Sequence, residues 1–268
     1  FDEYMEGIEQ KKMNRLTQVS ILIDQNEGSF TISDNGGIPV VIHKKFKGML
    51  PDMLFGTLRS SSNYTKDRGS KSGVHGVGAS LVNILSTKFT VSTADTKKHY
   101  IKTWHGVSSP DNTDGKTMEI GGKKTKYEKG RLMSTKEIIK KSSKHFTTIK
   151  ALINFAPFDV DHITDDMVEA MITRSVEIAA AGCNLKKPLK VMLKVVNKDK
   201  PDFKCIWEFK QFSQFSALFP NSDKFWGISR DRFQFEVGLS TTGKFESISI
   251  MNSIRCDHGT HIDTISDT

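Results

Sequence analysis

Apolar residues recur along this 268-residue chain with two periods, one typical of β-strands and one of α-helices. The β-branched runs Val19–Ile23 and Ser29–Ile32 flank the turn-like residues Gln25–Gly28, which predicts a β-hairpin. The same pattern predicts further strands at Phe89–Thr93, Tyr100–Trp104, Thr147–Phe155, Leu189–Val196, Phe233–Leu239 and Phe245–Met251, and helices over Phe1–Arg15, Pro51–Leu58 and Ala79–Leu85.

The longest helical pattern begins at Thr164, a residue type that favours the N-cap position. Two aspartates follow in the first turn, where the helix dipole favours negative charge, and the helical spacing continues to Gly182. Because helices and strands mix without regular βαβ alternation, we predict an α+β fold with a helix layer on a mostly antiparallel sheet. An aromatic-rich stretch that ends near Pro220 divides the chain into predicted domains at 1–221 and 222–268.

Composition narrows the class of protein. No apolar run approaches the ~20 residues that span a bilayer, so we expect no membrane partner. Three widely spaced cysteines (Cys183, Cys205 and Cys256) favour a reducing, intracellular compartment over a disulfide framework. The chain begins at Phe1 without a signal peptide, and we expect the true N-terminus to lie upstream.

The net charge of +8 fits a polyanionic partner, and the segment Gly121–His145 concentrates it, with nine Lys and Arg against two Glu. One interpretation of this segment is a solvated surface loop or helical insertion. The other is a patch that faces DNA and contacts phosphates without reading the base sequence.

The first candidate for chemistry is a glycine-rich segment. Its glycines leave backbone N–H groups able to close around an anion, and the helix predicted from Ala79 presents its positive end to the same place. The segment is either a phosphate cradle or a tight turn, and it is neither a Walker A loop nor a Rossmann turn. Its members are Gly73, Val74, His75, Gly76, Val77, Gly78, Ala79 and Ser80.

Two further segments suit a nucleotide. A carboxylate at the end of a predicted strand can accept a hydrogen bond from the adenine amine, and the glycines after it let a flat base approach the backbone. Clustered hydroxyl and amide side chains ahead of the glycine-rich segment are able to bind ribose and phosphate oxygens. Each segment alone is also an ordinary turn or loop. The residues are Asp34, Asn35, Gly37 and Ile38 in the first segment, and Ser61, Ser62 and Asn63 in the second.

Taken in their order along the chain, the three segments resemble the nucleotide site of type IIA DNA topoisomerases. The matching motifs are Asp-Asn-Gly-Gly-Ile-Pro from Asp34, Phe-Gly-x-Leu-x-x-Ser-Ser-Asn-Tyr from Phe55 and Gly-x-x-Gly-x-Gly-Ala from Gly73. That family belongs to the superfamily of gyrase, heat-shock chaperone, histidine kinase and mismatch-repair ATPases (GHKL). The resemblance implies a Bergerat-type ATPase sandwich followed by the start of a transducer domain.

The resemblance extends over nearly the whole chain apart from the basic segment. Asn83–Val91 and Lys102–Trp104 are similar to the eukaryotic and large-virus or phage branch of the family. Ser249–Arg255 resembles the opening of the transducer domain.

The resemblance also implies a role for each candidate residue. Asp34 and Asn35 would recognise the adenine, and Gly37 and Ile38 would lie under it. Ser61, Ser62 and Asn63 would contact ribose and phosphate, and the main chain from Gly73 to Ser80 would contact the triphosphate. Thr147 would place a hydroxyl beside the adenine-binding aspartate.

The sequence departs from the family pattern in three places. One residue is missing from the turn after Asp34, and Ser72 stands where a further glycine is common. The first helix of the family carries a Glu that activates water and, four residues later, an Asn that binds Mg²⁺. One alignment puts both upstream of Phe1, whereas another makes Glu3 the base and puts Gly7 at the Asn position, so that the metal ligand is lost. The catalytic base is therefore unassigned.

A competing motif, Cys256-x-His258-x-x-His261, offers three metal ligands at short spacing. No fourth ligand follows nearby, and the resemblance explains the segment without a metal. We therefore predict no zinc site.

The function that the resemblance implies is ATP binding and slow hydrolysis, with Mg²⁺ as cofactor, coupled to closure of a dimer gate (the N-gate) during DNA strand passage. The implied partners are DNA and another topoisomerase subunit, in a homodimer or heteromer, in the nucleus or a host cytoplasm. The chain would lack the DNA-cleavage core and would bind ATP better than it hydrolyses it. The alternatives are a chaperone-like or mismatch-repair-like ATPase, or a nucleic-acid-binding module with a degenerate nucleotide pocket.

Overall fold

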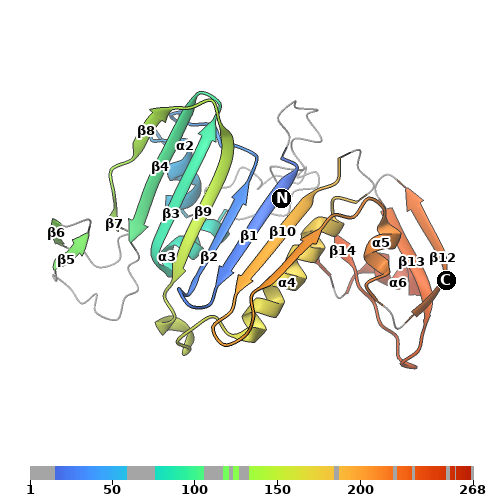
Figure 1. Cartoon of the computed structure of the whole chain (residues 1–268). Coiled ribbons are helices and arrows are strands. Elements are labelled where there is room, and N and C mark those ends of the chain that lie inside the picture. Colours follow the sequence, from blue (N-terminus) through green and yellow to red (C-terminus); the bar gives the residue numbers. More distant parts are fainter. Residues whose placement is uncertain are drawn as a thin grey trace.

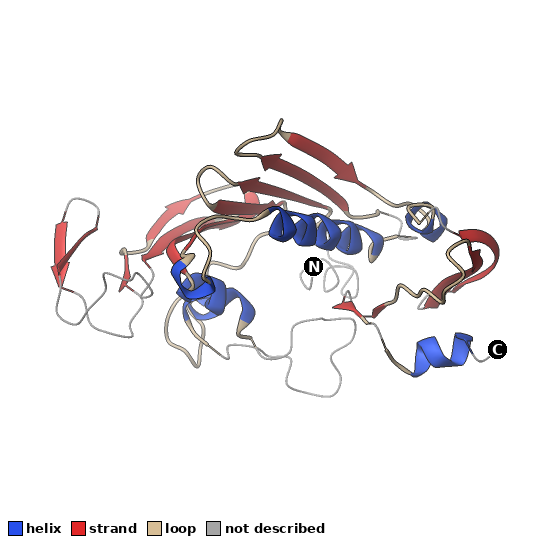
Figure 2. Cartoon of the chain, turned by 90° about the horizontal axis from the view of Figure 1, so that it is seen from below, coloured by secondary structure: helices blue, strands red, loops and turns tan. Residues whose placement is uncertain are grey.

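The structure is a computed structural model, and it describes residues 16–58, 76–105, 117–120, 123–126, 133–183, 187–219, 222–230, 233–251, 254–256 and 258–266. A twisted sheet dominates these residues (Figure 1), and helices lie against one of its faces (Figure 2). The helix predicted over Phe1–Arg15 lies outside the described residues.

The main sheet of the described residues has nine strands. They are β1 (Gln18–Asp24), β2 (Ser29–Asp34), β3 (Ser86–Asp95), β4 (Lys98–His105), β7 (Met133–Ser134), β8 (Ile138–Lys141), β9 (His145–Ile153), β10 (Lys190–Val196) and β11 (Phe203–Trp207). Eight of them follow the order β11-β10-β1-β2-β9-β3-β4-β7, and β8 pairs with β4. The β1–β10 pair is parallel and the other pairs of this sheet are antiparallel, which confirms the predicted sheet type.

β1 and β2 form the predicted hairpin. Its turn ends on Gly28, whose φ of +67° lies in the left-handed region that favours glycine. A Cβ atom at Gly28 would lie 2.8 Å from the ring of Phe155. Asp24 closes the other side of the turn, because its Oδ1 accepts hydrogen bonds from two backbone N–H groups of the turn.

Three helices, α2 (Leu50–Gly56), α3 (Gly78–Ile84) and α4 (Asp165–Ala180), lie on the same side of the sheet (Figure 2). α4 begins where the sequence predicts, since the side chain of Thr164 accepts a hydrogen bond from the backbone N–H of Met167 at 3.3 Å. The predicted helix layer on a mostly antiparallel sheet is thus confirmed. Among the described residues, no helix has both the length and the hydropathy to cross a membrane.

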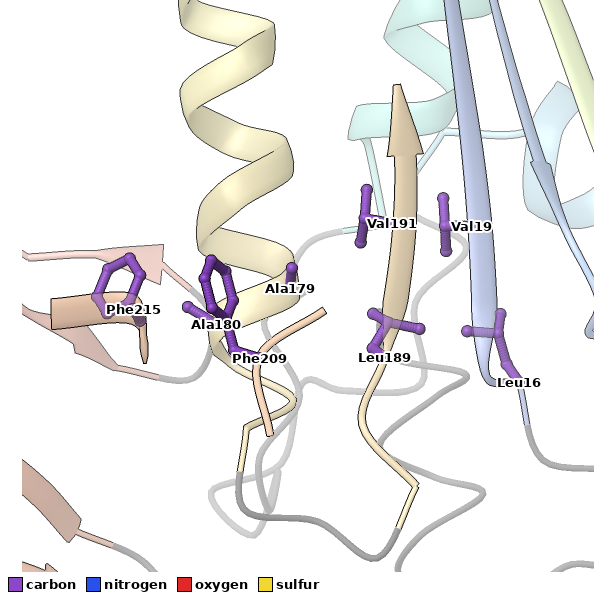
Figure 3. Close-up of a cluster of buried hydrophobic side chains, with 8 residues drawn as sticks. All are labelled: Leu16, Val19, Ala179, Ala180, Leu189, Val191, Phe209 and Phe215. Atoms are coloured by element: carbon purple, nitrogen blue, oxygen red, sulfur yellow. The ribbon is translucent and has the colours of Figure 1, made fainter. Parts of the chain in front are cut away.

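Apolar side chains between the sheet and the helices form three buried clusters, whose removal from water is the main driving force for folding. The first joins the end of α4 to β1 and β10 (Figure 3) and contains Leu16, Val19, Ala179, Ala180, Leu189, Val191, Phe209 and Phe215. The second, here named the α2–α3 core cluster, contains Val40, Met49, Phe55, Phe89, Val91, Tyr100, Trp104 and Ala151. The third contains Ile23, Ile163, Val168, Leu193 and Val195.

The C-terminal part of the chain forms smaller units. β12 (Ser222–Arg230) and β13 (Phe233–Ser240) pair antiparallel, and Ser216 of α5 (Phe212–Ser216) donates a hydrogen bond to Glu236 of β13. This part also contains β14 (Ile250–Met251), β15 (Ile254–Arg255) and α6 (Thr260–Ser266). The remaining short elements lie earlier in the chain and are β5 (Thr117–Ile120), β6 (Lys123–Lys126) and η1 (Ala156–Phe158). The division into domains at 1–221 and 222–268 stays a prediction.

The predicted strand over Phe245–Met251 is wrong for most of its length. Only its last two residues form a strand, and the Phe245 side chain is 74% exposed. Apolar alternation without a neighbouring strand provides no ladder of hydrogen bonds. The sequence analysis also missed β11 and β12. In the basic segment 121–145, the elements among the described residues are strands β6, β7, β8 and the first residue of β9 rather than a helix.

Candidate functional site

Three side chains from adjacent strands form a row at one end of the sheet. Asp34 of β2 is the ladder partner of Thr147 of β9, which is in turn the partner of Thr93 of β3. Directly opposed residues on neighbouring strands point to the same face. Asp34 alternates with Phe30 and Ile32, which both pack against buried clusters on the helix side. The row Asp34–Thr147–Thr93 therefore faces the helices.

Hydroxyl groups connect this row to the turn after β2. Thr147 Oγ1 lies 3.0 Å from Thr93 Oγ1 and 3.3 Å from the carbonyl oxygen of Gly36, to which it donates. The backbone N–H of Ile38 donates to Thr93 Oγ1 at 3.0 Å. Thr147 is 3% exposed and Thr93 is 0% exposed, so bulk water does not compete for these bonds. They fix the position of the turn on the sheet.

The carboxylate of Asp34 is oriented by its own turn. Its Oδ1 accepts a hydrogen bond from the backbone N–H of Gly36 at 2.9 Å, an arrangement that aspartate often makes with the residue two positions on. The side chain is only partly buried. A carboxylate held in this way at a strand end can accept a hydrogen bond from an amine on a planar base.

The side chain of Asn35 is occupied at the start of β1. Its Oδ1 accepts hydrogen bonds from the backbone N–H groups of Thr17 and Gln18 at 2.9 and 3.0 Å. Its Nδ2 donates to Thr17 Oγ1 at 3.0 Å. The amide therefore fastens the turn to β1, and its predicted contact with a nucleotide stays a prediction.

Gly37 lies where no side chain fits. A Cβ atom there would be 2.1 Å from the carbonyl oxygen of Ala94 and 2.8 Å from the ring of His145. The turn thus crosses the ends of β3 and β9 in close contact, and the next residue, Ile38, packs against the α2–α3 core cluster. The predicted approach of a base to Gly37 and Ile38 is not tested by these contacts.

The start of α3 is the second half of the candidate site. Gly76 has a φ of +61°, and Val77 precedes the helix without a side-chain capping hydrogen bond. Gly78 and Ala79 are exposed. Because the first N–H groups of a helix have no acceptor within the helix, they are able to bind an anion that reaches them.

The inner side of α3 is anchored to α2. The Ser80 hydroxyl donates to the carbonyl oxygen of Thr57 at 2.9 Å, and Asn83 Nδ2 donates to the carbonyl oxygen of Phe55 at 3.0 Å. Val82 packs against the α2–α3 core cluster. The side chain of Ser80 thus serves packing, and only its main chain remains for the predicted phosphate contact.

Both halves of the site lie on the same face of the sheet, because Ile38 from one and Val82 from the other pack against the same core cluster. The other predicted nucleotide contacts lie outside the described residues. These are Ser61, Ser62, Asn63, Gly73, Val74 and His75, and the alternative base Glu3 and its neighbour Gly7 are outside them as well.

The sequence analysis missed Thr93 and Asp95. Burial alone would raise the pKa of Asp95, but hydrogen bonds from the backbone N–H groups of Val40, Lys98 and Lys97 together hold it below its ordinary value. The alternation along β3 could have identified them. Alternate residues of a strand share a face, and Thr93 and Asp95 follow the buried Phe89 and Val91 at every second position.

A surface hollow of about 140 Å³ lies elsewhere, between α4 and the β10–β11 hairpin. Val195 and Asn197 line it at the end of β1 that carries Asp24, whereas Asp34 pairs with Val19 at the opposite end. The hollow is therefore not part of the candidate site.

The Cys256–His261 motif gathers no metal site in the structure. Among the described residues, no three His, Cys, Asp or Glu side chains lie close enough to share a metal ion. His261 Nε2 instead lies 2.6 Å from the hydroxyl of Ser249.

Over its whole length the chain is similar to DNA topoisomerase 2 proteins of eukaryotes. It is 31% identical over 277 residues to DNA topoisomerase 2 of Bombyx mori and 29% identical over 278 residues to DNA topoisomerase 2 top-2 of Caenorhabditis elegans. Each alignment covers 100% of this chain and 16% of the relative, so the chain spans about a sixth of the length of these relatives. No protein-family model matches the chain.

Solved structures agree with the sequence comparison. The ATPase and transducer domains of DNA topoisomerase II from Balamuthia mandrillaris superpose with a TM-score of 0.71 at 25% identity, covering 99% of this chain and 63% of that one. The ATPase region of Saccharomyces cerevisiae topoisomerase II gives a TM-score of 0.68 over 99% of this chain and 64% of that one; at 20% identity it supports the fold alone. The chain is thus similar in sequence to type II DNA topoisomerases, and its fold is similar to that of their ATPase and transducer domains.

Proposed function

We propose that this chain binds ATP, with adenine at the Asp34–Thr147–Thr93 row and the triphosphate at the start of α3. The observation that carries the proposal is the row itself, in which a turn-oriented carboxylate lies beside two buried hydroxyl groups on the helix side of the sheet. The exposed, glycine-flanked start of α3 on the same face supports it with uncapped main-chain donors.

Hydrolysis of the bound ATP needs a base and Mg²⁺, and the described residues supply no cluster of metal ligands. The family resemblance assigns the base to a Glu and the Mg²⁺ ligand to an Asn of the first helix, where Glu3 is the alternative base. The metal would supply charge neutralisation at the phosphates. The described residues would hold the adenine and orient the phosphate chain.

In the whole protein, ATP binding would close a dimer gate around DNA, and hydrolysis would reopen it. DNA and a second topoisomerase subunit are therefore the proposed partners, in the nucleus or a host cytoplasm. The similarity to DNA topoisomerase 2 proteins supports this reading over a chaperone-like or mismatch-repair-like ATPase.

The test is a calorimetric titration of the chain with a non-hydrolysable ATP analogue and Mg²⁺. Asp34→Asn replaces the acceptor that would bind the adenine amine, and we expect about tenfold to hundredfold weaker binding, since a hydrogen bond to a charged group contributes about 1.5–3 kcal/mol. Asp199→Asn is the matched control, because it removes the same charge from an exposed residue of the loop before β11.

Equal affinity of wild type and Asp34→Asn, with both folded, would show that the adenine assignment is wrong. Absence of any nucleotide binding by the wild type would instead favour a nucleic-acid-binding module with a degenerate pocket.

A further inference from the structure

Five exposed lysines meet at one corner of the main sheet, where the β3–β4 turn lies against the segment that joins β8 to β9 (Figure 1). Two backbone hydrogen bonds join the segments, from Thr96 N–H to the carbonyl oxygen of Lys144 at 2.9 Å and from Ser142 N–H to that of Lys97 at 3.0 Å. This lysine corner consists of Lys97, Lys98, Lys140, Lys141 and Lys144.

Like charges oppose each other in the lysine corner. Lys98 of β4 is the direct ladder partner of Lys141 of β8, a pairing that costs stability. None of the five ammonium groups forms an ion pair with another described residue. Asp95, at the end of β3 beside the turn, is already engaged by the backbone N–H groups of Val40, Lys97 and Lys98.

The pKa of His99 reflects the positive charge around it. Burial lowers its pKa below the ordinary value, and the charges of Lys140 and Lys144 lower it further. The fold thus keeps a concentration of uncompensated positive charge at this corner, which a polyanion would neutralise.

Lysines on an edge strand also discourage pairing between sheets, and β8 pairs with β4 alone in the described sheet. That role accounts for Lys140 and Lys141. It does not account for Lys97 in the turn or for Lys144 beyond β8.

We infer that the lysine corner is a contact surface for the phosphate backbone of duplex DNA. The choice of DNA among polyanions rests on the proposed function. The inference narrows the DNA-facing hypothesis for the basic segment to Lys140, Lys141 and Lys144. It adds Lys97 and Lys98, which lie outside that segment and reach the same surface only through the fold.

The test compares two variants of equal net charge. The corner variant carries Lys98→Gln, Lys140→Gln, Lys141→Gln and Lys144→Gln, and the control variant carries Lys198→Gln, Lys204→Gln, Lys210→Gln and Lys244→Gln at exposed positions elsewhere. Binding to a labelled mixed-sequence duplex is measured by fluorescence anisotropy over a salt series without nucleotide. Each lost phosphate contact flattens the slope of log affinity against log salt by about 0.9.

We expect the slope of the corner variant to be flatter than that of wild type by up to about 3.6, because four lysines are removed, and the slope of the control variant to be nearly unchanged. The melting temperature of the corner variant should not fall, because the substitutions relieve repulsion between Lys98 and Lys141. Equal slopes for both variants would overturn the inference. In a parallel measurement with vesicles containing phosphatidylserine, weaker binding of the corner variant to the vesicles but not to the duplex would also overturn it. Undiminished binding of the ATP analogue to the corner variant separates this result from the test of the nucleotide site.

Discussion

At the residue scale, the candidate site depends on buried groups that have little freedom to change. Thr93 Oγ1 accepts from the Ile38 N–H and donates to the carbonyl oxygen of Phe146, while also lying within hydrogen-bond distance of Thr147. A buried donor that loses its acceptor costs about 1–3 kcal/mol. The hydroxyl groups therefore act as supports for the turn that carries Asp34, whatever their contact with a nucleotide.

Gly37→Ala tests this close packing. The added Cβ would stand 2.1 Å from the backbone oxygen of Ala94, which the strand cannot move without disturbing its ladder. We expect a loss of about 1–3 kcal/mol in the free energy of unfolding, measured by urea denaturation.

Gly78→Ala is the control for this prediction, because a Cβ at Gly78 would have no heavy atom within 4 Å. It should leave stability unchanged or raise it by up to about 1 kcal/mol, since alanine favours a helix over glycine. If Gly37→Ala proved as stable as Gly78→Ala, the turn would be looser than its contacts indicate.

At the element scale, Asp52 fixes α2 to the sheet through two polar contacts within an apolar interface. The hydroxyl of Tyr100 in β4 donates to Asp52 Oδ1 at 2.8 Å, and Lys102 pairs with the same oxygen. The Asp52 and Lys102 side chains are 17% and 13% exposed, so removing one partner would leave a poorly solvated charge. These contacts set the position of α2 and, through Phe55, of α3.

The ionisation of Tyr100 predicts how stability changes with pH. Burial and the hydrogen bond to Asp52 raise its pKa in the folded protein, whereas in the unfolded chain it titrates near pH ~10. Its contribution is thus fully present below pH ~10 and is lost as the pH rises above that value, by up to about 1.4 kcal/mol per unit.

Tyr100→Phe isolates this effect, because phenylalanine does not ionise. The difference in the free energy of unfolding between wild type and variant should shrink between about pH 9 and about pH 11. Chemical denaturation across this range measures it, and a constant difference would contradict the prediction. The other groups that titrate in this range, including three further tyrosines and the lysines, are common to both proteins and therefore cancel in the difference.

At the scale of the whole molecule, the proposed gate requires two chains to associate when nucleotide is bound. A nucleotide can shift this equilibrium only by binding the associated state more tightly than the separate chains. The Asp34–Thr147–Thr93 row is fixed to the sheet. The tighter association of two chains would therefore have to come from other parts of the chain that move when nucleotide binds.

Sedimentation velocity with and without a non-hydrolysable ATP analogue checks this expectation. We expect a faster-sedimenting dimer in the presence of the analogue and Mg²⁺. Asp34→Asn should remain at the nucleotide-free sedimentation coefficient at the same analogue concentration. A distribution that ignores nucleotide while calorimetry reports binding would separate ATP binding from gate closure.

Prediction from sequence succeeded where an element depends on neighbouring residues. The β1–β2 hairpin follows from its turn, and the start of α4 follows from the cap at Thr164. It failed for β12, which Gly227 and charged residues interrupt and which a bulge between Lys224 and Trp226 joins to β13. Such a strand exists because a partner lies beside it, and its own pattern carries little signal.

The sequence by itself determined the order of the glycine-rich, acidic and hydroxyl segments, their resemblance to one family, and the local elements that flank them. These features depend on residue identity and on interactions within a few positions. Only the tertiary structure decided that Thr93 stands beside Thr147, 54 residues away, and that Thr147 bonds Gly36 across 111 residues. Strand order and register fix such neighbours, and both are set by the burial of apolar side chains over the whole sheet, a sum that no single segment contains.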